Sequence, residues 1–355
     1  MDNKRKLEEN PAENEMPTQK RRIIEFQPSV KNIQTLADLI TISKEWTDFK
    51  GKLKKGNKNE KIRHELIIKK YMDYEKISNI RNHLENLNNL VGMKELKKNI
   101  VNQILFFTQD LHHKEMMHTV LMGQPGVGKT VVAQILGNIY KDLGMLKKGT
   151  FKIAQRADFV GEYLGSTAIK TKKLLESCIG GVLFIDEAYS LGNKEKRDSF
   201  AKESIDTLNQ FLSEHTDNFI CIIAGYEHSL NECFFSWNEG LERRFPWKFN
   251  LTKYSSSELK DILLYQITNN GWLHNISNDD LLAITKQNEA LFTSNGGDCL
   301  LYFDKCKIYH ARRVFGSPVE TKFILTKEDF VEGMKLFKEF KSKKQPENIP
   351  IGIYL

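Results

Sequence analysis

A glycine-rich segment after a short apolar run carries the residues best suited to chemistry in this chain. The spacing G-x-x-x-x-G-K-T puts Gly126 and Gly128 where successive backbone N–H groups can turn inward around bound phosphates. The Lys129 side chain then reaches the β- and γ-phosphates, and the Thr130 hydroxyl offers a ligand to Mg²⁺. The pattern predicts a phosphate-binding loop for ATP, made of Gly123, Gln124, Pro125, Gly126, Val127, Gly128, Lys129 and Thr130.

A second apolar run, residues 181–185, ends in two acidic residues. Five consecutive apolar residues are typical of a parallel strand that is buried on both faces. Carboxylates at the end of such a strand lose hydration, which costs free energy unless they bind a partner such as a metal ion. Asp186 is therefore predicted to hold Mg²⁺ from its second side, and Glu187 is predicted to be the base that polarises the attacking water. A glutamate directly after this aspartate favours an ATP hydrolase over a small-molecule kinase.

The elements that flank the glycine-rich segment fit this interpretation. The apolar run that begins at Thr119 reads as a strand, and residues 131–136 repeat their apolar side chains with the period of a helix. A helix that begins at the loop points its partial positive charge at the triphosphate. The sequence therefore predicts the strand, loop and helix that such a motif requires.

Four motifs in this order resemble the CbbX/SpoVK (CfxQ-like) family of AAA+ ATPases. The resemblance is close from about residue 87 to 251 and looser beyond. It implies an α/β fold, a P-loop NTPase three-layer αβα sandwich with a parallel sheet, followed by a small all-α C-terminal lid domain. It also implies a hexameric ring that holds ATP between neighbouring subunits and moves loops in a central pore. The motifs are residues 124–130, 159–167, 180–189 and 223–226.

The resemblance also implies roles for residues outside the phosphate-binding loop. Tyr163 and Leu164 match the aromatic pore loop, where an aromatic beside an aliphatic side chain grips an extended polypeptide by apolar contact. Arg244 matches the arginine finger that a neighbouring subunit supplies, with Arg243 as the alternative. Tyr226 occupies the sensor position after the fourth strand, where many AAA+ proteins have Asn.

One departure from the family pattern concerns the C-terminal domain. Residues 295–298 stand where the family shows a Gly-Asn-Ala-Arg type of sequence that ends in a sensor arginine. Asp298 cannot contact a phosphate as a cation would. Two interpretations stay open: either Arg312 or Arg313 compensates from further along the helix, or the nucleotide couples the two domains differently.

The chain divides into five predicted parts. Capping patterns at Ser255, Ser277 and Thr326, each with an acidic residue three positions later, predict the starts of helices in the C-terminal part. The first residues contain few large apolar side chains and are predicted to be disordered. The predicted parts are a basic tail (1–22), an N-terminal helical element (23–86), the AAA+ α/β domain (87–251), the helical lid domain (252–345) and a tail (346–355).

Composition narrows the class of protein. The five cysteines include no C-x-x-C pair, which argues against a disulfide framework and a zinc site. No run of eighteen apolar residues occurs, and the first residues lack the apolar part of a secretory signal, so we expect no membrane association. These features predict the cytoplasm as the location. Two basic clusters near residues 4–6 and 20–22 leave the nucleus as an alternative.

Charge is concentrated near the N-terminus. Residues 1–70 contain 17 Lys and Arg against 11 Asp and Glu, whereas the whole chain has a formal net charge of +7. A nucleic-acid role, which we do not favour, would therefore belong to this segment.

The sequence predicts an enzyme of a defined kind. We expect a Mg²⁺-dependent ATP hydrolase that assembles with itself into a ring, and two alternatives stay open. Its partner is an unknown protein substrate that it remodels through a central pore. The first alternative is a P-loop ATPase that processes nucleic acid. The second is a scaffold that binds nucleotide without hydrolysing it.

Overall fold

A five-stranded parallel sheet lies at the centre of the molecule. The computed structural model describes residues 25–53, 65–112, 115–163 and 165–343. The strands are β1 (Thr119–Gly123), β2 (Phe151–Ala154), β3 (Val182–Ile185), β4 (Ile220–Gly225) and β5 (Trp247–Leu251). They lie in the order β2-β3-β4-β1-β5, and every neighbouring pair is parallel. Parallel strands place their carboxyl ends at one edge of the sheet, which is where ligands bind in open α/β folds.

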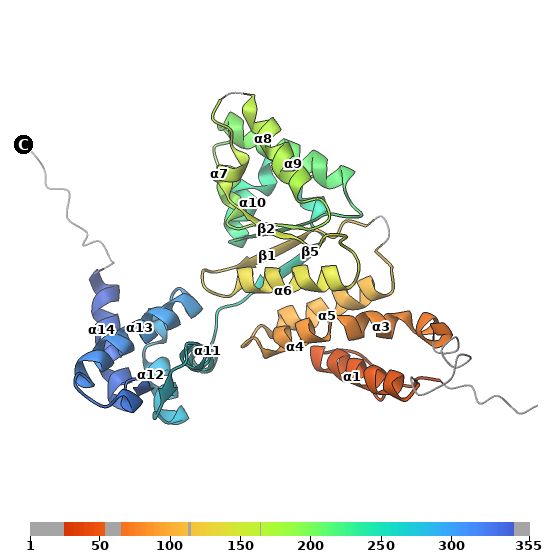
Figure 1. The fold of residues 1–355 in the computed structure, drawn as a ribbon. Helices are drawn as coiled ribbons and strands as arrows, with labels where there is room; N and C mark the ends of the chain where they lie inside the picture. The colour runs from red at the N-terminus through yellow and green to blue at the C-terminus, as the bar shows by residue number, and fades with distance from the viewer. Residues whose placement is uncertain (1–24, 54–64, 113–114, 164, 344–355) are drawn as a thin grey trace, which may run out of the picture.

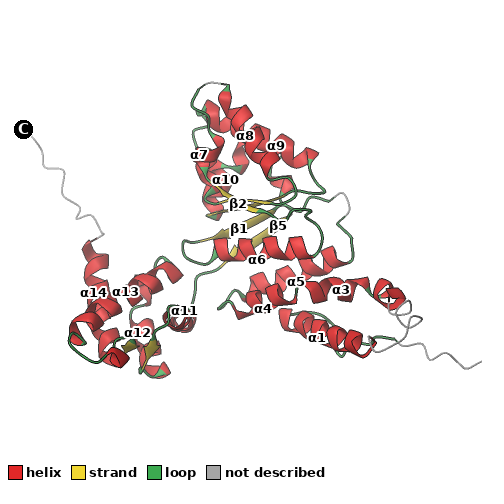
Figure 2. Ribbon diagram, viewed as in Figure 1, coloured by secondary structure: helices red, strands yellow, loops and turns green. Residues whose placement is uncertain are grey.

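Helices cover both faces of this sheet, as Figures 1 and 2 show. In β4, Ile220, Ile222 and Ala224 face one buried cluster, whereas Cys221 and Ile223 face the other. This alternation follows from the two-residue period of a strand, and it explains why the inner strands β3 and β4 are apolar throughout. Helices α5 (Lys94–Thr108) and α6 (Lys129–Asp142) pack on the first face, and α8 (Ser166–Ser177) and α9 (Ser199–Glu214) pack on the second. The predicted three-layer αβα sandwich is confirmed.

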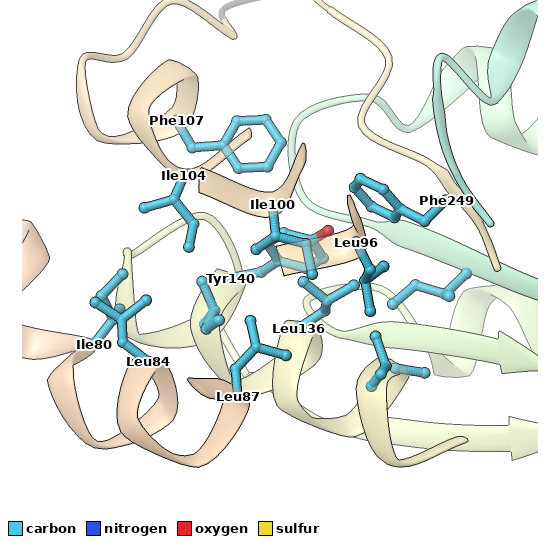
Figure 3. Packing of buried hydrophobic residues seen from close by; sticks show 14 of the residues in the cluster. Ile80, Leu84, Leu87, Leu96, Ile100, Ile104, Phe107, Leu136, Tyr140 and Phe249 are labelled. Carbon is cyan, nitrogen blue, oxygen red and sulfur yellow. The ribbon is translucent and has the colours of Figure 1, made fainter. Parts of the chain in front are cut away.

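The N-terminal helices share the buried core of the sheet's first face. They are α1 (Leu36–Leu53), α3 (Met72–Asn79) and α4 (Arg81–Asn89). Figure 3 shows Ile80, Leu84 and Leu87 beside side chains from α5 and α6. The side chains of Ile80, Leu84 and Leu87 are all fully buried. The helices predicted over residues 23–86 therefore pack on the sheet domain as an additional layer, and Figure 1 shows α1 and α4 below α5 and α3 beside it.

Short elements connect the main helices and strands of the sheet domain. The turn between β3 and α9 holds a 3₁₀ helix that directly follows Asp186 and Glu187. These elements are α7 (Arg156–Phe159), η1 (Ala188–Leu191), α10 (Glu227–Cys233), η2 (Phe235–Trp237) and η3 (Glu242–Arg244).

A separate helical domain follows β5 after an extended connection (Figure 1). Its core contains Leu263, Tyr302, Phe303 and Phe330, all fully buried. This confirms the predicted all-α lid domain, to which the structure adds a small parallel pair of strands. The elements are α11 (Ser256–Asn269), β6 (Leu273–His274), α12 (Asn278–Gln287), η4 (Glu289–Leu291), α13 (Asn295–Arg313), η5 (Val319–Thr321), β7 (Ile324–Leu325) and α14 (Lys327–Lys343).

The predicted helix starts in this domain are present. Ser255 and Glu258 form a reciprocal capping box before α11, and the Ser277 hydroxyl accepts a hydrogen bond from the backbone N–H of Asp280. At α14 the Thr326 N–H donates to the Asp329 carboxylate over 2.8 Å. These caps satisfy N–H groups that a helix leaves without an internal partner.

Both predicted tails lie outside the described residues. In the described part of the chain, no helix combines the length and the apolar character that crossing a membrane requires.

Candidate functional site

A cavity of about 880 Å³ lies at the carboxyl edge of the sheet, against the C-terminal domain. Its size lies in the range of small-molecule sites. Residues from the glycine-rich loop, the end of β3, the end of β4, α4 and α11 all line it. Among these lining residues, Lys129 is the only Lys or Arg. They include Asn86, Asn89, Leu90, Pro125, Gly126, Gly128, Lys129, Thr130, Asp186, Glu187, Tyr189, Tyr226, Tyr254, Ile262, Gln266 and Gly296.

The glycine-rich loop has the backbone that its sequence predicts. Gly126 and Gly128 have φ values of +70° and +91°, which residues with a Cβ rarely adopt. A Cβ on Gly126 would also lie 2.0 Å from the carbonyl oxygen of Ser294 in the C-terminal domain. Gly128 is the N-cap of α6, so the positive end of this helix faces the cavity. The loop can therefore present backbone N–H groups to an anion.

Lys129 folds back onto the loop. Its Nζ donates hydrogen bonds to the carbonyl oxygens of Gly123 and Gln124, both over 2.9 Å. Burial lowers the pKa of the Lys129 ammonium, while the negative charges of Asp186 and Glu187 oppose this shift. Lys129 therefore lies inside the loop, among the groups that would surround a triphosphate.

Asp186 and Glu187 follow β3, whose four residues are fully buried. Glu187 has a left-handed backbone, with φ +50° and ψ +46°, and its N–H donates to Asp186 Oδ1 over 3.0 Å. Such a conformation is unusual for a residue with a side chain, and it is often found at functional sites. Burial and the adjacent Glu187 carboxylate raise the pKa of Tyr189 to about 12. The Tyr189 hydroxyl therefore stays protonated beside the two carboxylates.

Tyr226 directly follows β4 and lies between two groups of the site. The Lys129 Nζ lies 5.7 Å from the centroid of the Tyr226 ring. The centroids of the Tyr226 and Tyr189 rings are also 5.7 Å apart. Tyr226 therefore contacts the site through its ring.

Three residues that the sequence analysis did not assign to the site join the C-terminal domain to the loop. The Tyr254 hydroxyl donates a hydrogen bond to the Val127 carbonyl over 2.9 Å. Asn295 Nδ2 donates to the Pro125 carbonyl over 3.1 Å, and the Gly296 N–H donates to the Gly126 carbonyl over 3.0 Å. Burial raises the pKa of Tyr254 to about 12, which keeps its hydroxyl a donor.

Comparisons with known proteins identify the family. The family model described as "ATPase family associated with various cellular activities (AAA)" matches residues 119–242. A cfxQ-like protein of Acanthamoeba polyphaga mimivirus is 38% identical over 68% of this chain and 60% of its own length. Stage V sporulation protein K of Bacillus subtilis is 41% identical over 49% of this chain and 56% of its own. The CfxQ homolog of Pyropia yezoensis is 34% identical over 61% of this chain and 71% of its own. This chain belongs to the CfxQ-like family of AAA+ ATPases.

The chain spans about 60% of the length of the first two of these relatives. Among solved structures, the AAA domain of FIGL-1 in complex with ADP has a TM-score of 0.54 and 18% sequence identity. The match covers 70% of this chain and 83% of that chain. At this identity the likeness supports the AAA fold alone.

Three residues that the family resemblance singled out lie outside the cavity. The Arg244 side chain is held by its own chain, because its Nε donates to Ser213 Oγ over 3.0 Å and its Nη1 donates to the Gly240 carbonyl over 2.6 Å. Arg243, the alternative, is exposed. Tyr163 is 74% exposed on the loop between α7 and α8. Leu164 lies outside the described residues.

The structure separates the C-terminal arginines from the cavity. Gly296, near the start of α13, lines the cavity, whereas Arg312 and Arg313 end the same helix. A helix rises 1.5 Å per residue, so Arg312 lies about 24 Å along the axis from Gly296. Arg313 also pairs with Asp329, with N···O distances of 2.9 and 2.8 Å. Neither arginine therefore replaces a sensor arginine in this arrangement of the family fold.

Asp298, at the position where the family pattern ends in arginine, is buried and has a structural partner. Its carboxylate accepts a hydrogen bond from the Ser294 N–H over 2.6 Å and lies 2.7 Å from Lys341 Nζ. The Lys341 ammonium therefore balances its charge within the C-terminal domain.

Proposed function

We propose that this protein is a Mg²⁺-dependent ATP hydrolase whose site is the cavity described above. The observation that carries the proposal is that one cavity collects the glycine-rich loop, Lys129, Thr130, Asp186 and Glu187. The loop N–H groups and Lys129 would bind the phosphates, and Glu187 would polarise the attacking water.

The residues present fit a magnesium ion with its nucleotide. Mg²⁺ prefers oxygen ligands, and the Thr130 hydroxyl and the Asp186 carboxylate line the same cavity. When bound, the ion would neutralise charge on the phosphate oxygens. The apolar part of the cavity, with Leu90 and Ile262, offers a surface for the base of the nucleotide.

The proposal includes assembly into a ring of identical subunits, with a hexamer as the expected size. Within one subunit, Lys129 is the only Lys or Arg among the described lining residues of the cavity. A second cation for the γ-phosphate would come from Arg244 of an adjacent subunit. The internal hydrogen bonds of Arg244 would hold its side chain in one orientation for that purpose.

The proposed work of the ring is to remodel a protein by pulling a segment through its pore. Support comes from Tyr163, whose exposed ring lies in the loop that begins α8. Leu164 belongs to the same proposed pore loop. The five cysteines are unpaired in the structure, which fits the cytoplasm as the proposed location.

The test combines hydrolysis with assembly. ATP hydrolysis is measured for the wild type, for Glu187→Gln and for Glu195→Gln, an exposed glutamate in the same connection that serves as the control. We expect hydrolysis to fall at least about 100-fold in Glu187→Gln, with ATP still bound, and to persist in the control. Size-exclusion chromatography with and without ATP measures assembly. A wild type that binds ATP without hydrolysing it would support the scaffold alternative, and stimulation by DNA would support the nucleic-acid alternative.

A further inference from the structure

The carbonyl oxygens of the phosphate-binding loop are all held by hydrogen bonds. Lys129 holds the first two, those of Gly123 and Gln124. The C-terminal part of the chain holds the next three, with donors from Asn295, Gly296 and Tyr254 to the carbonyls of Pro125, Gly126 and Val127.

Holding a carbonyl oxygen also orients the N–H group of the next residue. The peptide unit is planar and trans, so the C=O of one residue and the N–H of the next point in opposite directions. The bonds to Pro125, Gly126 and Val127 therefore fix the N–H groups of Gly126, Val127 and Gly128. These are donors that a phosphate-binding loop presents to its anion. In contrast, the Gln124 carbonyl precedes Pro125, which has no N–H.

The donors are themselves held in place. Asn295 is 2% exposed, and its Oδ1 accepts a hydrogen bond from the Tyr254 N–H over 3.3 Å while its Nδ2 reaches Pro125. Asn295 has φ +49°, a left-handed conformation that asparagine tolerates better than most residues. Tyr254 lies just before α11 and Asn295 begins α13, so two separate segments of the C-terminal part of the chain meet at the loop.

We propose that Tyr254 and Asn295 are positioning residues that preorganise the phosphate-binding loop from the C-terminal domain. This contact links the two domains at the place where the chain lacks a sensor arginine. Phosphate binding and the orientation of the C-terminal domain then depend on one another, because coupling between two equilibria is reciprocal. The inference rests on the proposed nucleotide site and adds a coupling that works through the backbone of the loop.

The test compares the affinities of ADP and AMP. AMP lacks the β-phosphate that the loop N–H groups bind. A loss of preorganisation should therefore weaken the binding of ADP more than the binding of AMP. The variants are Tyr254→Phe, which removes the donor to Val127, and Asn295→Gly, which removes the donor to Pro125 without adding charge and suits the left-handed φ of +49°. Tyr309→Phe is the matched control, because its hydroxyl bonds the exposed Glu328 elsewhere in the domain. Dissociation constants are measured by displacement of a fluorescent adenine nucleotide.

We expect each variant to raise the dissociation constant of ADP at least about fivefold, the effect of losing one net hydrogen bond, and that of AMP less than twofold. The control should leave both constants unchanged. Equal weakening of ADP and AMP, or unchanged ADP affinity in both variants, would overturn the coupling and leave the nucleotide site intact. A wild type that binds no ADP would instead overturn the proposed function on which the coupling rests.

Discussion

The ammonium nitrogen of Lys129 lies 5.7 Å from the centroid of the Tyr226 ring. A cation at this distance is attracted by the negative face of the ring, an interaction worth about 0.5 to 2 kcal/mol depending on burial. Tyr226, which stands at the predicted sensor position, therefore contacts the loop lysine through its ring.

Tyr226→Ala should lower kcat/KM for ATP about tenfold, because Lys129 loses the ring that limits its movement. Tyr226→Phe keeps the ring and should stay within about twofold of the wild type. Steady-state hydrolysis measured over a range of ATP concentrations checks both values. If kcat/KM fell as far in Tyr226→Phe as in Tyr226→Ala, the hydroxyl and not the ring would be the important group.

Arg244→Ala should reduce ATP hydrolysis at least about 100-fold while ATP binding is retained, since a finger acts on the transition state in the neighbouring site. Arg243→Ala is the control and should retain most activity, because this side chain is exposed. Hydrolysis and the dissociation constant of ATP are measured on the same preparations. Retained turnover in Arg244→Ala, or its loss in Arg243→Ala, would contradict the assignment.

Gly126→Ala should weaken nucleotide binding at least about tenfold and shift the contact between the domains. The added Cβ would lie 2.0 Å from the Ser294 carbonyl oxygen, which is too close for any real contact. Gly144→Ala is the matched control, because Gly144 also has a left-handed φ, +83°, but its Cβ would meet no atom within 4 Å. Titration with ADP and thermal unfolding of both variants separate the clash from general backbone strain. Equal ADP affinities in the two variants would rule out the clash as the cause.

His118 should make the folded state less stable in mild acid. Burial lowers its pKa from about 6.5 to about 4, and its Nδ1 accepts a hydrogen bond from the Cys221 N–H over 3.1 Å. The unfolded chain therefore takes up a proton at a higher pH than the folded chain. The contribution of neutral His118 is fully present above pH 6.5 and is lost as the pH falls toward 4, by about 3 kcal/mol in total.

His118→Asn, which keeps an acceptor near Nδ1, should remove most of this pH dependence. The free energy of unfolding from urea titrations at pH 7 and pH 5 checks this, with about 2 kcal/mol more lost by the wild type than by the variant. The same loss in both proteins would show that other groups dominate the acid response.

The local parts of the site followed from sequence because each depends on a few adjacent residues. The loop around Gly126 needs left-handed backbone, the helix after it needs apolar residues at helical spacing, and the carboxylates after β3 follow a run that is apolar on both faces. These requirements are short-range and leave clear patterns. The same is true of the capping residues at Ser255 and Ser277.

The contact between the domains left no such pattern. Tyr254 meets a residue 127 positions earlier, and Asn295 meets one 170 positions earlier. Their partners are backbone carbonyl oxygens, which every residue possesses and which therefore leave no signature in side-chain identity. Likewise, the apolar spacing in residues 23–86 predicted helices but could not name the surface on which they pack.

The shared core of the N-terminal helices restricts how this chain can exchange parts with its relatives. Leu84 and Leu87 fill the same packed space as Ile100, Leu136 and Tyr140. Recombination that replaced only the segment before residue 87 would bring together two surfaces shaped for different neighbours. New specificity at this end of the molecule is therefore more accessible through changes to the solvent-facing side of α1 and α3 than through replacement of the whole segment.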